Sequence, residues 1–157
     1  MPATAEKLEE LPSVDTSSLR RFEIPDLDRH REWFLPRIRA AYKHLNDRQL
    51  VGWLRGICHS NEFQFLYQDT CVGMFQIMSA HTLMPQPTIY ERFVFCADKD
   101  NVEHQKQAAQ FYAEAAKWGR FQAAGAIIVE QMSDVPHEMI RAVTGRLMTR
   151  QEVYHPL

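Results

Sequence analysis

The sequence predicts an α/β protein of the α+β kind, with one mixed, mostly antiparallel sheet and helices on both faces. Residues 62–67 alternate between apolar and polar side chains, and a strand-like run at 71–78 follows after a short turn, so the pair is typical of a hairpin. Residues 89–97 are mostly apolar on both faces, as in a central strand covered on two sides. Residues 102–118 then change to helical spacing. A mixed sheet between two helical layers accounts for all three observations.

Composition limits the classes of function. A chain of 157 residues with 45% hydrophobic residues is about one domain in size and can bury an ordinary core. The net charge of −2 gives no general attraction to nucleic acid or anionic membrane. No apolar run approaches the roughly 20 residues that span a bilayer, and the first residues lack the pattern of a secretory signal. Three scattered cysteines indicate a reducing compartment rather than a disulfide framework.

The chain divides into an arm and one domain. Residues 1–18 lack hydrophobic periodicity and are rich in acidic side chains, so we expect an N-terminal arm there and a domain over 19–157. An arm of this composition becomes ordered only where something holds it. Either its own domain or a protein partner, including a second copy of the chain, would do so.

The first half of the domain predicts one strand and two helices. Residues 19–24 form a short strand candidate, and residues 27–45 carry apolar side chains at three-four spacing. Asp26 is suited to cap this long helix. Asn46 would then close it, and Asp47 would cap a second, shorter helix.

The second half predicts three further elements after the long helix at 102–118. Gly119 is expected to end that helix, and Tyr112 to lie in the core. A short buried strand follows at 126–129 and a helix at 136–143. The alternating residues 147–154 predict a closing strand.

This order of elements resembles the GNAT N-acetyltransferase superfamily over about residues 19–154. The likeness is carried by the strand 93–97, the long helix and the run from Lys117 to Glu130. In that superfamily two parallel central strands splay apart, the pantetheine of acyl-CoA lies in the gap, and its pyrophosphate binds the start of the long helix. The resemblance implies that the cofactor-binding positions would be Val94, Phe95, Cys96, Lys99, Val102, Glu103 and His104.

The loop between this strand and the long helix departs from the superfamily pattern. The family loop, Gln/Arg-x-x-Gly-x-Gly/Ala, falls on residues 99–104, where Val102 and His104 replace the two small residues. Glycine allows backbone N–H groups to close on phosphate, whereas a stiff β-branched residue and a bulky ring obstruct it. Acidic side chains also surround the loop at Asp98, Asp100 and Glu103. The pattern favours a helix start capped by its own carboxylates over a phosphate cradle.

The catalytic positions of the superfamily are also altered. Arg141 stands where many members have the tyrosine that protonates the departing thiolate. Glu91 lies on the central strand and is the candidate general base. Alternatively, Glu91 is a structural carboxylate that pairs with Arg92 or with a neighbouring strand.

Other chemistries have weaker support. The pair His137–Glu138 begins like the zinc-protease helix motif, but Arg141 occupies the position of the second histidine, so no metal site is expected. Cys96 at a strand end could act as a nucleophile, but its apolar context favours a buried thiol, as it does for the other two cysteines.

Two functions remain open. The first is a GNAT-fold protein that has lost acetyl-CoA chemistry, needs no cofactor and acts as a binding or structural component with a protein partner or as a homo-oligomer. The acidic arm and altered loop resemble GNAT-like proteins of tailed phages, some of which resemble virion or assembly components, so cytoplasm or a virion would be its location. The second is an active acetyl-CoA-dependent N-acetyltransferase, in which Lys99 and the N–H groups of 102–104 hold phosphate and Glu91 is the base.

Overall fold

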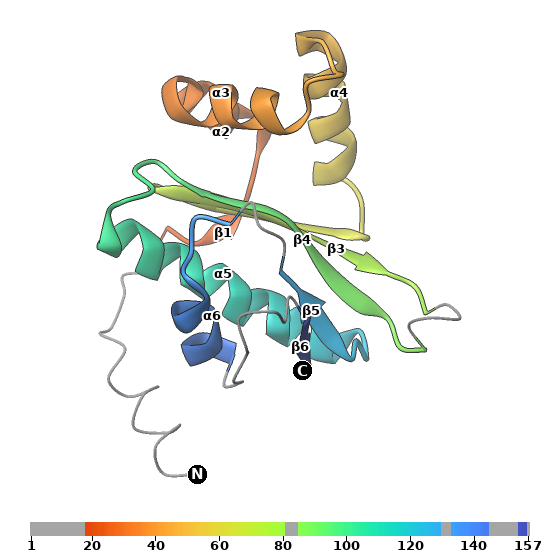
Figure 1. Ribbon diagram of the computed structural model, residues 1–157. Helices are drawn as coiled ribbons and strands as arrows, with labels where there is room; N and C mark the ends of the chain where they lie inside the picture. The colour runs from red at the N-terminus through yellow and green to blue at the C-terminus, as the bar shows by residue number, and fades with distance from the viewer. Residues whose placement is uncertain (1–17, 81–84, 130–132, 145–153, 157) are drawn as a thin grey trace.

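The computed structural model describes residues 18–80, 85–129, 133–144 and 154–156. Its described strands form one mixed sheet in the order β1-β2-β3-β4-β5-β6 (Figure 1). Neighbouring strands are antiparallel except β4 and β5, which are parallel. Their bounds are β1 Arg20–Arg21, β2 Phe63–Gln68, β3 Cys71–Met78, β4 Thr88–Cys96, β5 Ala126–Ile128 and β6 Tyr154–Pro156.

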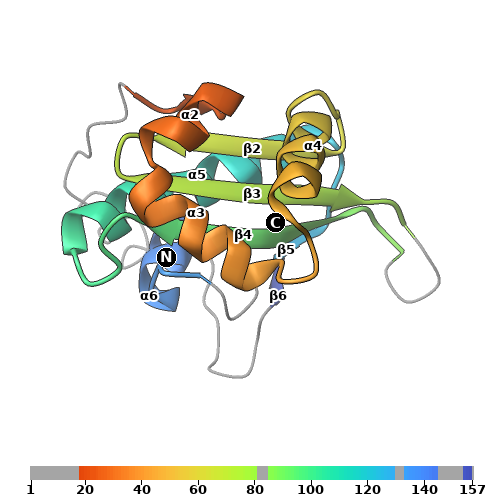
Figure 2. The ribbon, with the colours of Figure 1, turned by 90° about the horizontal axis from the view of Figure 1, so that it is seen from above.

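Helices cover both faces of this sheet, which confirms the predicted fold class (Figures 1 and 2). Of the helices among the described residues, three lie in one layer and two in the opposite layer. The first layer comprises α2 (Ile24–Arg29), α3 (Arg31–Ala41) and α4 (Asp47–Cys58), and the second comprises α5 (Val102–Phe121) and α6 (His137–Thr144).

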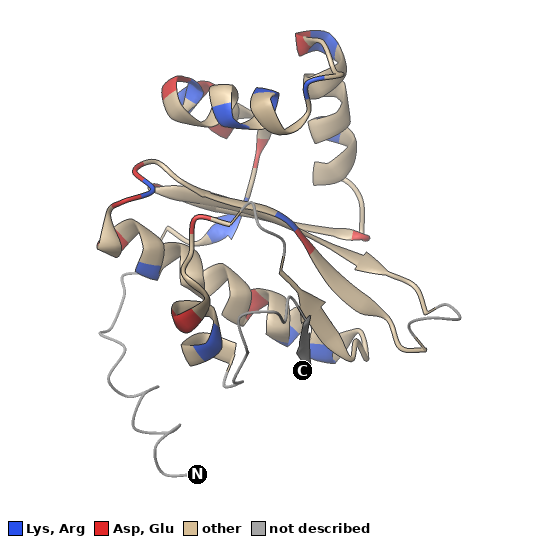
Figure 3. Cartoon of the chain, viewed as in Figure 1, with Lys and Arg blue, Asp and Glu red and all other residues tan. Residues whose placement is uncertain are grey.

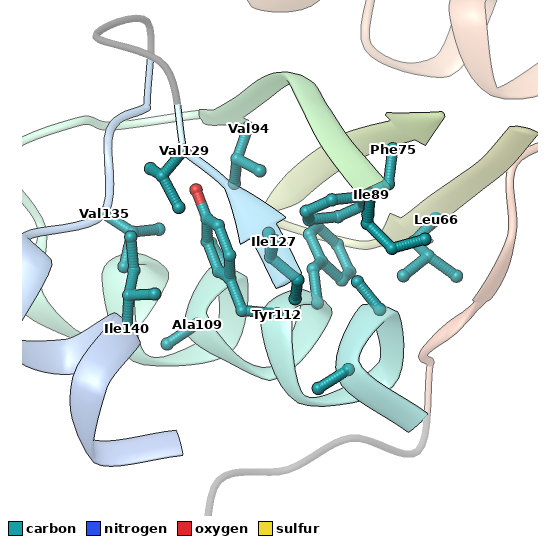
Figure 4. Packing of buried hydrophobic residues seen from close by; sticks show 14 of the residues in the cluster. Leu66, Phe75, Ile89, Val94, Ala109, Tyr112, Ile127, Val129, Val135 and Ile140 are labelled. Atoms are coloured by element: carbon teal, nitrogen blue, oxygen red, sulfur yellow. The ribbon is translucent and has the colours of Figure 1, made fainter. Parts of the chain in front are cut away.

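Strand β4 supplies side chains to both hydrophobic cores. Phe93 and Phe95 pack in the core under α2 to α4, whereas Val94 and Cys96 pack in the core under α5 and α6. Tyr112 of α5 is fully buried in this second core, as predicted (Figure 4). The absence of a solvated face explains why the sequence of β4 lacks strict alternation.

A β-bulge changes the direction of side chains in the middle of β4. Met74 pairs with Phe93 and Phe75 pairs with Glu91, so Arg92 is the extra residue. Bulges of this kind reorient the side chains that flank them. As a result Glu91 lies opposite Phe75, on the α5 face of the sheet.

The start of the domain differs from the prediction. The strand predicted over 19–24 is only two residues long, because a helix already begins at Ile24. In place of the long helix predicted over 27–45 there are two helices, α2 and α3, which meet at His30. Helix α3 ends at Ala41. Asp26 is not the cap residue. It lies in the first turn of α2, where its carboxylate accepts the backbone N–H of Glu23 at 2.8 Å.

Two further helix boundaries also differ. Asn46 does not close the preceding helix but caps α4, since its side chain accepts the N–H of Gln49 at 2.9 Å. Helix α5 continues past Gly119 to Phe121. Its end is set by Ala123, which has a φ of 58°, and the Ala124 N–H returns to the Gly119 carbonyl at 2.8 Å. This is a left-handed helix terminus built on alanine instead of glycine.

Several predictions fall outside the described residues. The arm predicted at 1–18 lies there except for its last residue, as does most of the strand predicted over 147–154. Within the described part, Tyr154–Pro156 pair antiparallel with β5.

Candidate functional site

The start of α5 is capped by the junction that precedes it. The Asn101 side chain accepts the N–H of His104 at 3.2 Å, and the His104 Nδ1 accepts the N–H of Asp98 at 3.1 Å. The cap is therefore Asn101, not the carboxylates of Asp100 and Glu103 that the sequence favoured. Glu103 is instead exposed and lies 3.6 Å from the Lys106 ammonium group. Figure 3 shows the mixed charges at this end of β4.

Strand β4 pairs with two separate later segments, β5 near its start and Ser133–Asp134 near its end. The two strands pair in parallel from Thr88 to Tyr90, with Tyr90 opposite Ile128. Further along, Val94 does not face Ile128 but bridges to Ser133. The next residue, Asp134, donates its N–H to the Val94 carbonyl at 3.0 Å and accepts the N–H of Cys96 at 2.9 Å. The carboxyl end of β4 is thus hydrogen-bonded by this later segment.

A bidentate ion pair holds this segment against the opposite helical layer. Arg37 of α3 donates two hydrogen bonds of 2.7 Å to the Asp134 carboxylate. The Arg37 guanidinium carbon also lies 4.3 Å from the centre of the Phe95 ring. The Asp134 side chain is 10% exposed and that of Arg37 is 32% exposed, so the pair is partly shielded from water. Arg–carboxylate pairs of this geometry fix both distance and orientation.

A pocket of about 660 Å³ lies beside this ion pair. Its volume falls in the range of small-ligand sites, roughly 300–1,000 Å³. One wall is an apolar stretch of α3, the other is the end of β4, and the polar groups are two basic residues, a serine and the carboxylate. The lining residues are Trp33, Pro36, Arg37, Ala40, Ala41, Phe95, Lys99, Ser133 and Asp134. Such a lining suits a ligand with an apolar body and an anionic group.

Neither Glu91 nor Tyr112 lines this pocket: the Tyr112 ring lies in the second core (Figure 4), where the Glu91 carboxylate is close enough to perturb its hydroxyl. Both are 0% exposed. Burial raises the pKa of Tyr112 well above its usual value, and the neighbouring Glu91 carboxylate raises it further. The Tyr112 hydroxyl is hydrogen-bonded to Ser133. The neighbouring Arg92 donates to the side chain of Gln76, on β3, at 2.8 Å.

The remaining predicted positions are dispersed. Arg141 lies on α6, 4.0 Å from Glu138, and does not line the pocket. Val102 is 53% exposed on the first turn of α5. Cys96 is buried, and burial together with the Asp134 carboxylate raises its pKa to about 12. A thiol with this pKa stays protonated near neutral pH, which argues against a nucleophilic role.

Of the predicted site residues, the pocket brings together Phe95 and Lys99. The sequence did not single out Arg37, Ser133 or Asp134 as candidate site residues. No local signal identifies them, because Arg37 and Asp134 are 97 positions apart.

Comparisons of the chain with models of known protein families, with curated proteins and with solved structures found no match. In the part of the chain that the structure describes, no three His, Cys, Asp or Glu side chains are grouped to hold a metal ion. No helix there is long and apolar enough to cross a membrane. Fold and site together define an α/β protein with a mixed sheet and a ligand-sized pocket at the carboxyl end of its central strand.

Proposed function

We propose that this chain is a GNAT-like protein that has lost acetyl-CoA chemistry and acts as a binding component. The observation that supports it best is the contact of Ser133 and Asp134 with the end of β4. The resemblance would place pantetheine along this part of β4. The backbone groups of Val94 and Cys96 that such a ligand would meet are already bonded to Asp134.

Displacing this segment would be costly. An incoming pantetheine would have to break the Asp134 hydrogen bonds to β4 and the bidentate pair with Arg37. A buried donor left without a partner costs about 1–3 kcal/mol, and the partly exposed ion pair contributes about 1 kcal/mol more. A ligand amide could replace the backbone bonds, but it would leave the Arg37–Asp134 pair to be rearranged.

The groups that the family reaction needs are poorly placed for it. Glu91 is the candidate base, but it is sealed in the core beside Tyr112 and lines no part of the pocket. Arg141 replaces the family tyrosine, and a guanidinium does not release its proton at ordinary pH. Neither residue is therefore equipped for proton transfer to a substrate in the pocket.

The start of α5 is also unfavourable for pyrophosphate. The N–H of His104, in the first turn, is already bonded to the Asn101 side chain, and the N–H of Asp98, before the helix, is bonded to the His104 ring. Three carboxylates, those of Asp98, Asp100 and Glu103, lie in the same stretch as Lys99. Anions are stabilised at a helix start only when its donors are available and the local charge does not repel them.

A titration tests the proposal. Calorimetry with acetyl-CoA and with CoA should show no binding at millimolar ligand, for the natural chain and for Lys99→Ala. Lys117→Ala is the matched control, because Lys117 is an exposed lysine near the other end of α5. Micromolar binding that is lost in Lys99→Ala and kept in Lys117→Ala would overturn the proposal.

The alternative is an active N-acetyltransferase with an atypical CoA loop. It is favoured by one observation, that Lys99 lines a pocket large enough for part of a cofactor. Acetyl transfer from acetyl-CoA to a panel of amines, lost in Lys99→Ala and in Glu91→Gln, would establish it. The proposed binding component, in contrast, would act without a cofactor, through a protein partner or a second copy, in a reducing cytoplasm or within a virion.

A further inference from the structure

The last turn of α5 presents an exposed aromatic surface beside a second pocket. Phe121 is 87% exposed, the highest value among the large hydrophobic residues that the structure describes as exposed. It follows Trp118 by three positions on the helix, and Trp118 lines a pocket of about 350 Å³. The "aromatic surface" is Phe121 with the lining of this pocket, namely Arg21, Asn61, Phe63, Gln64, Trp118 and Gln122.

The composition of the aromatic surface is that of a polypeptide-binding site. Exposed phenylalanine is unfavourable in water, and tryptophan and arginine are the side chains that most often dominate binding at protein interfaces. The other polar side chains of the lining, those of Asn61, Gln64 and Gln122, are amides that can bond to a peptide backbone.

Two polar groups of the aromatic surface can take a further partner. The Gln64 Oε1 is buried and accepts no hydrogen bond from the described residues. The Arg21 guanidinium reaches the Phe63 carbonyl at 3.5 Å, and no described carboxylate lies within ion-pair distance of it. A segment that presents an N–H donor, a carboxylate and apolar side chains would therefore complement the aromatic surface.

The chain itself contains a segment with these properties. Residues 1–17 precede the described part of the chain, which begins only three positions before Arg21. They include three apolar side chains that could cover aromatic rings, Leu8, Leu11 and Val14, and four acidic ones, Glu6, Glu9, Glu10 and Asp15. Arg21 and Trp118 line the same pocket, so a segment joined three positions before Arg21, at up to about 3.3 Å per residue, has only a short distance to span.

We infer that residues 1–17 dock on the aromatic surface of their own molecule, with acidic side chains toward Arg21 and apolar side chains on Trp118 and Phe121. Charge complementarity and the short connection to β1 favour this occupant over a separate partner. A tethered segment meets its site at a high effective concentration, so modest contacts suffice. The inference does not depend on whether the chain binds acyl-CoA.

Trypsin cleavage after Lys7 tests the docking in the full chain. Lys7 is the first trypsin site in the sequence, and the next basic residue is Arg20. Docking should slow cleavage at Lys7 by about tenfold or more relative to a free peptide of residues 1–17, since tenfold corresponds to about 1.4 kcal/mol. Phe121→Ala and Arg21→Gln should each restore much of the free-peptide rate.

Val102→Ala is the matched control, because Val102 is an exposed hydrophobic residue at the other end of α5 and should leave the rate unchanged. Phe121 is exposed, so its replacement leaves the cores intact, and a melting curve checks this. Cleavage of the natural chain at the free-peptide rate would overturn the inference. So would protection that rises with protein concentration alongside a dimer in sedimentation, because the occupant would then be a second copy.

Discussion

Replacing Asp134 with alanine removes the contact that closes the carboxyl end of β4. The carboxylate accepts two hydrogen bonds from Arg37 and one from the backbone N–H of Cys96. Since Cys96 is 1% exposed, water does not readily replace the lost acceptor at its N–H group. Arg37 would be left partly buried over the Phe95 ring without its counter-charge.

The magnitude follows from these separate losses. An unsatisfied buried N–H costs about 1–3 kcal/mol. The ion pair is worth less than a fully buried one, because the Arg37 side chain is 32% exposed and stays partly hydrated; we assign it about 1 kcal/mol. Asp134→Ala should therefore lower the free energy of unfolding by about 3 kcal/mol. Asp134→Asn keeps an acceptor for the Cys96 N–H and should lose only about 1 kcal/mol.

Urea unfolding followed by circular dichroism measures both variants. A double-mutant cycle with Arg37→Ala should give a coupling energy of about 1 kcal/mol between the two side chains. A loss below about 0.5 kcal/mol for Asp134→Ala, which is the range of an ordinary surface substitution, would refute the reasoning. Equal losses for the alanine and asparagine variants would show that the Cys96 N–H does not depend on this acceptor.

Three further predictions concern the stability of the fold, each measured by urea unfolding. Ala123→Gly should raise the free energy of unfolding by about 0.5–1 kcal/mol, because φ is 58° there; a loss would contradict a left-handed helix end. Gly73→Ala should lower it by about 1–3 kcal/mol, since the new Cβ would lie 2.7 Å from a ring carbon of α5. Its control is Gly52→Ala, which should not lower the free energy of unfolding, because nothing lies within 4 Å of the new Cβ. Burial raises the pKa of Cys71 and Cys96, so the unfolded chain loses protons first as pH rises. Stability should fall above about pH 8.5, by up to about 1.4 kcal/mol per pH unit per thiol, and less steeply in the single alanine variants.

The elements with strong local patterns were predictable from the sequence. The strand predicted over 71–78 coincides with β3, and the helix predicted from Val102 begins there. Burial of β4 on both faces was also predicted, because its apolar residues do not alternate. Each of these signals depends only on neighbouring residues and on which faces of an element are buried.

Helix ends were harder to predict because more than one residue can supply the cap or the left-handed conformation that ends a helix. Gly119 is the ordinary signal for a helix end, but it is buried inside α5, while Ala123 takes the left-handed conformation. Asn46 similarly follows one helix and caps the next. The sequence predicted that it closes the first helix, whereas it caps α4. In both places the deciding factor is packing of the helix, which single residues do not encode.

The candidate site shows the same limit at longer range. The expectation that Val102 and His104 would obstruct a phosphate loop needs only local sequence, and it stays a prediction. The contact of Asp134 with β4 and Arg37 could not be anticipated, because it joins segments far apart in the chain. A changed loop alone could be compensated by other phosphate contacts, and a closed strand edge alone could open on binding. Under the proposed resemblance both features would lie on the acyl-CoA path near the carboxyl end of β4, so one compensation would not restore binding, and this supports the proposed binding component over an acetyltransferase.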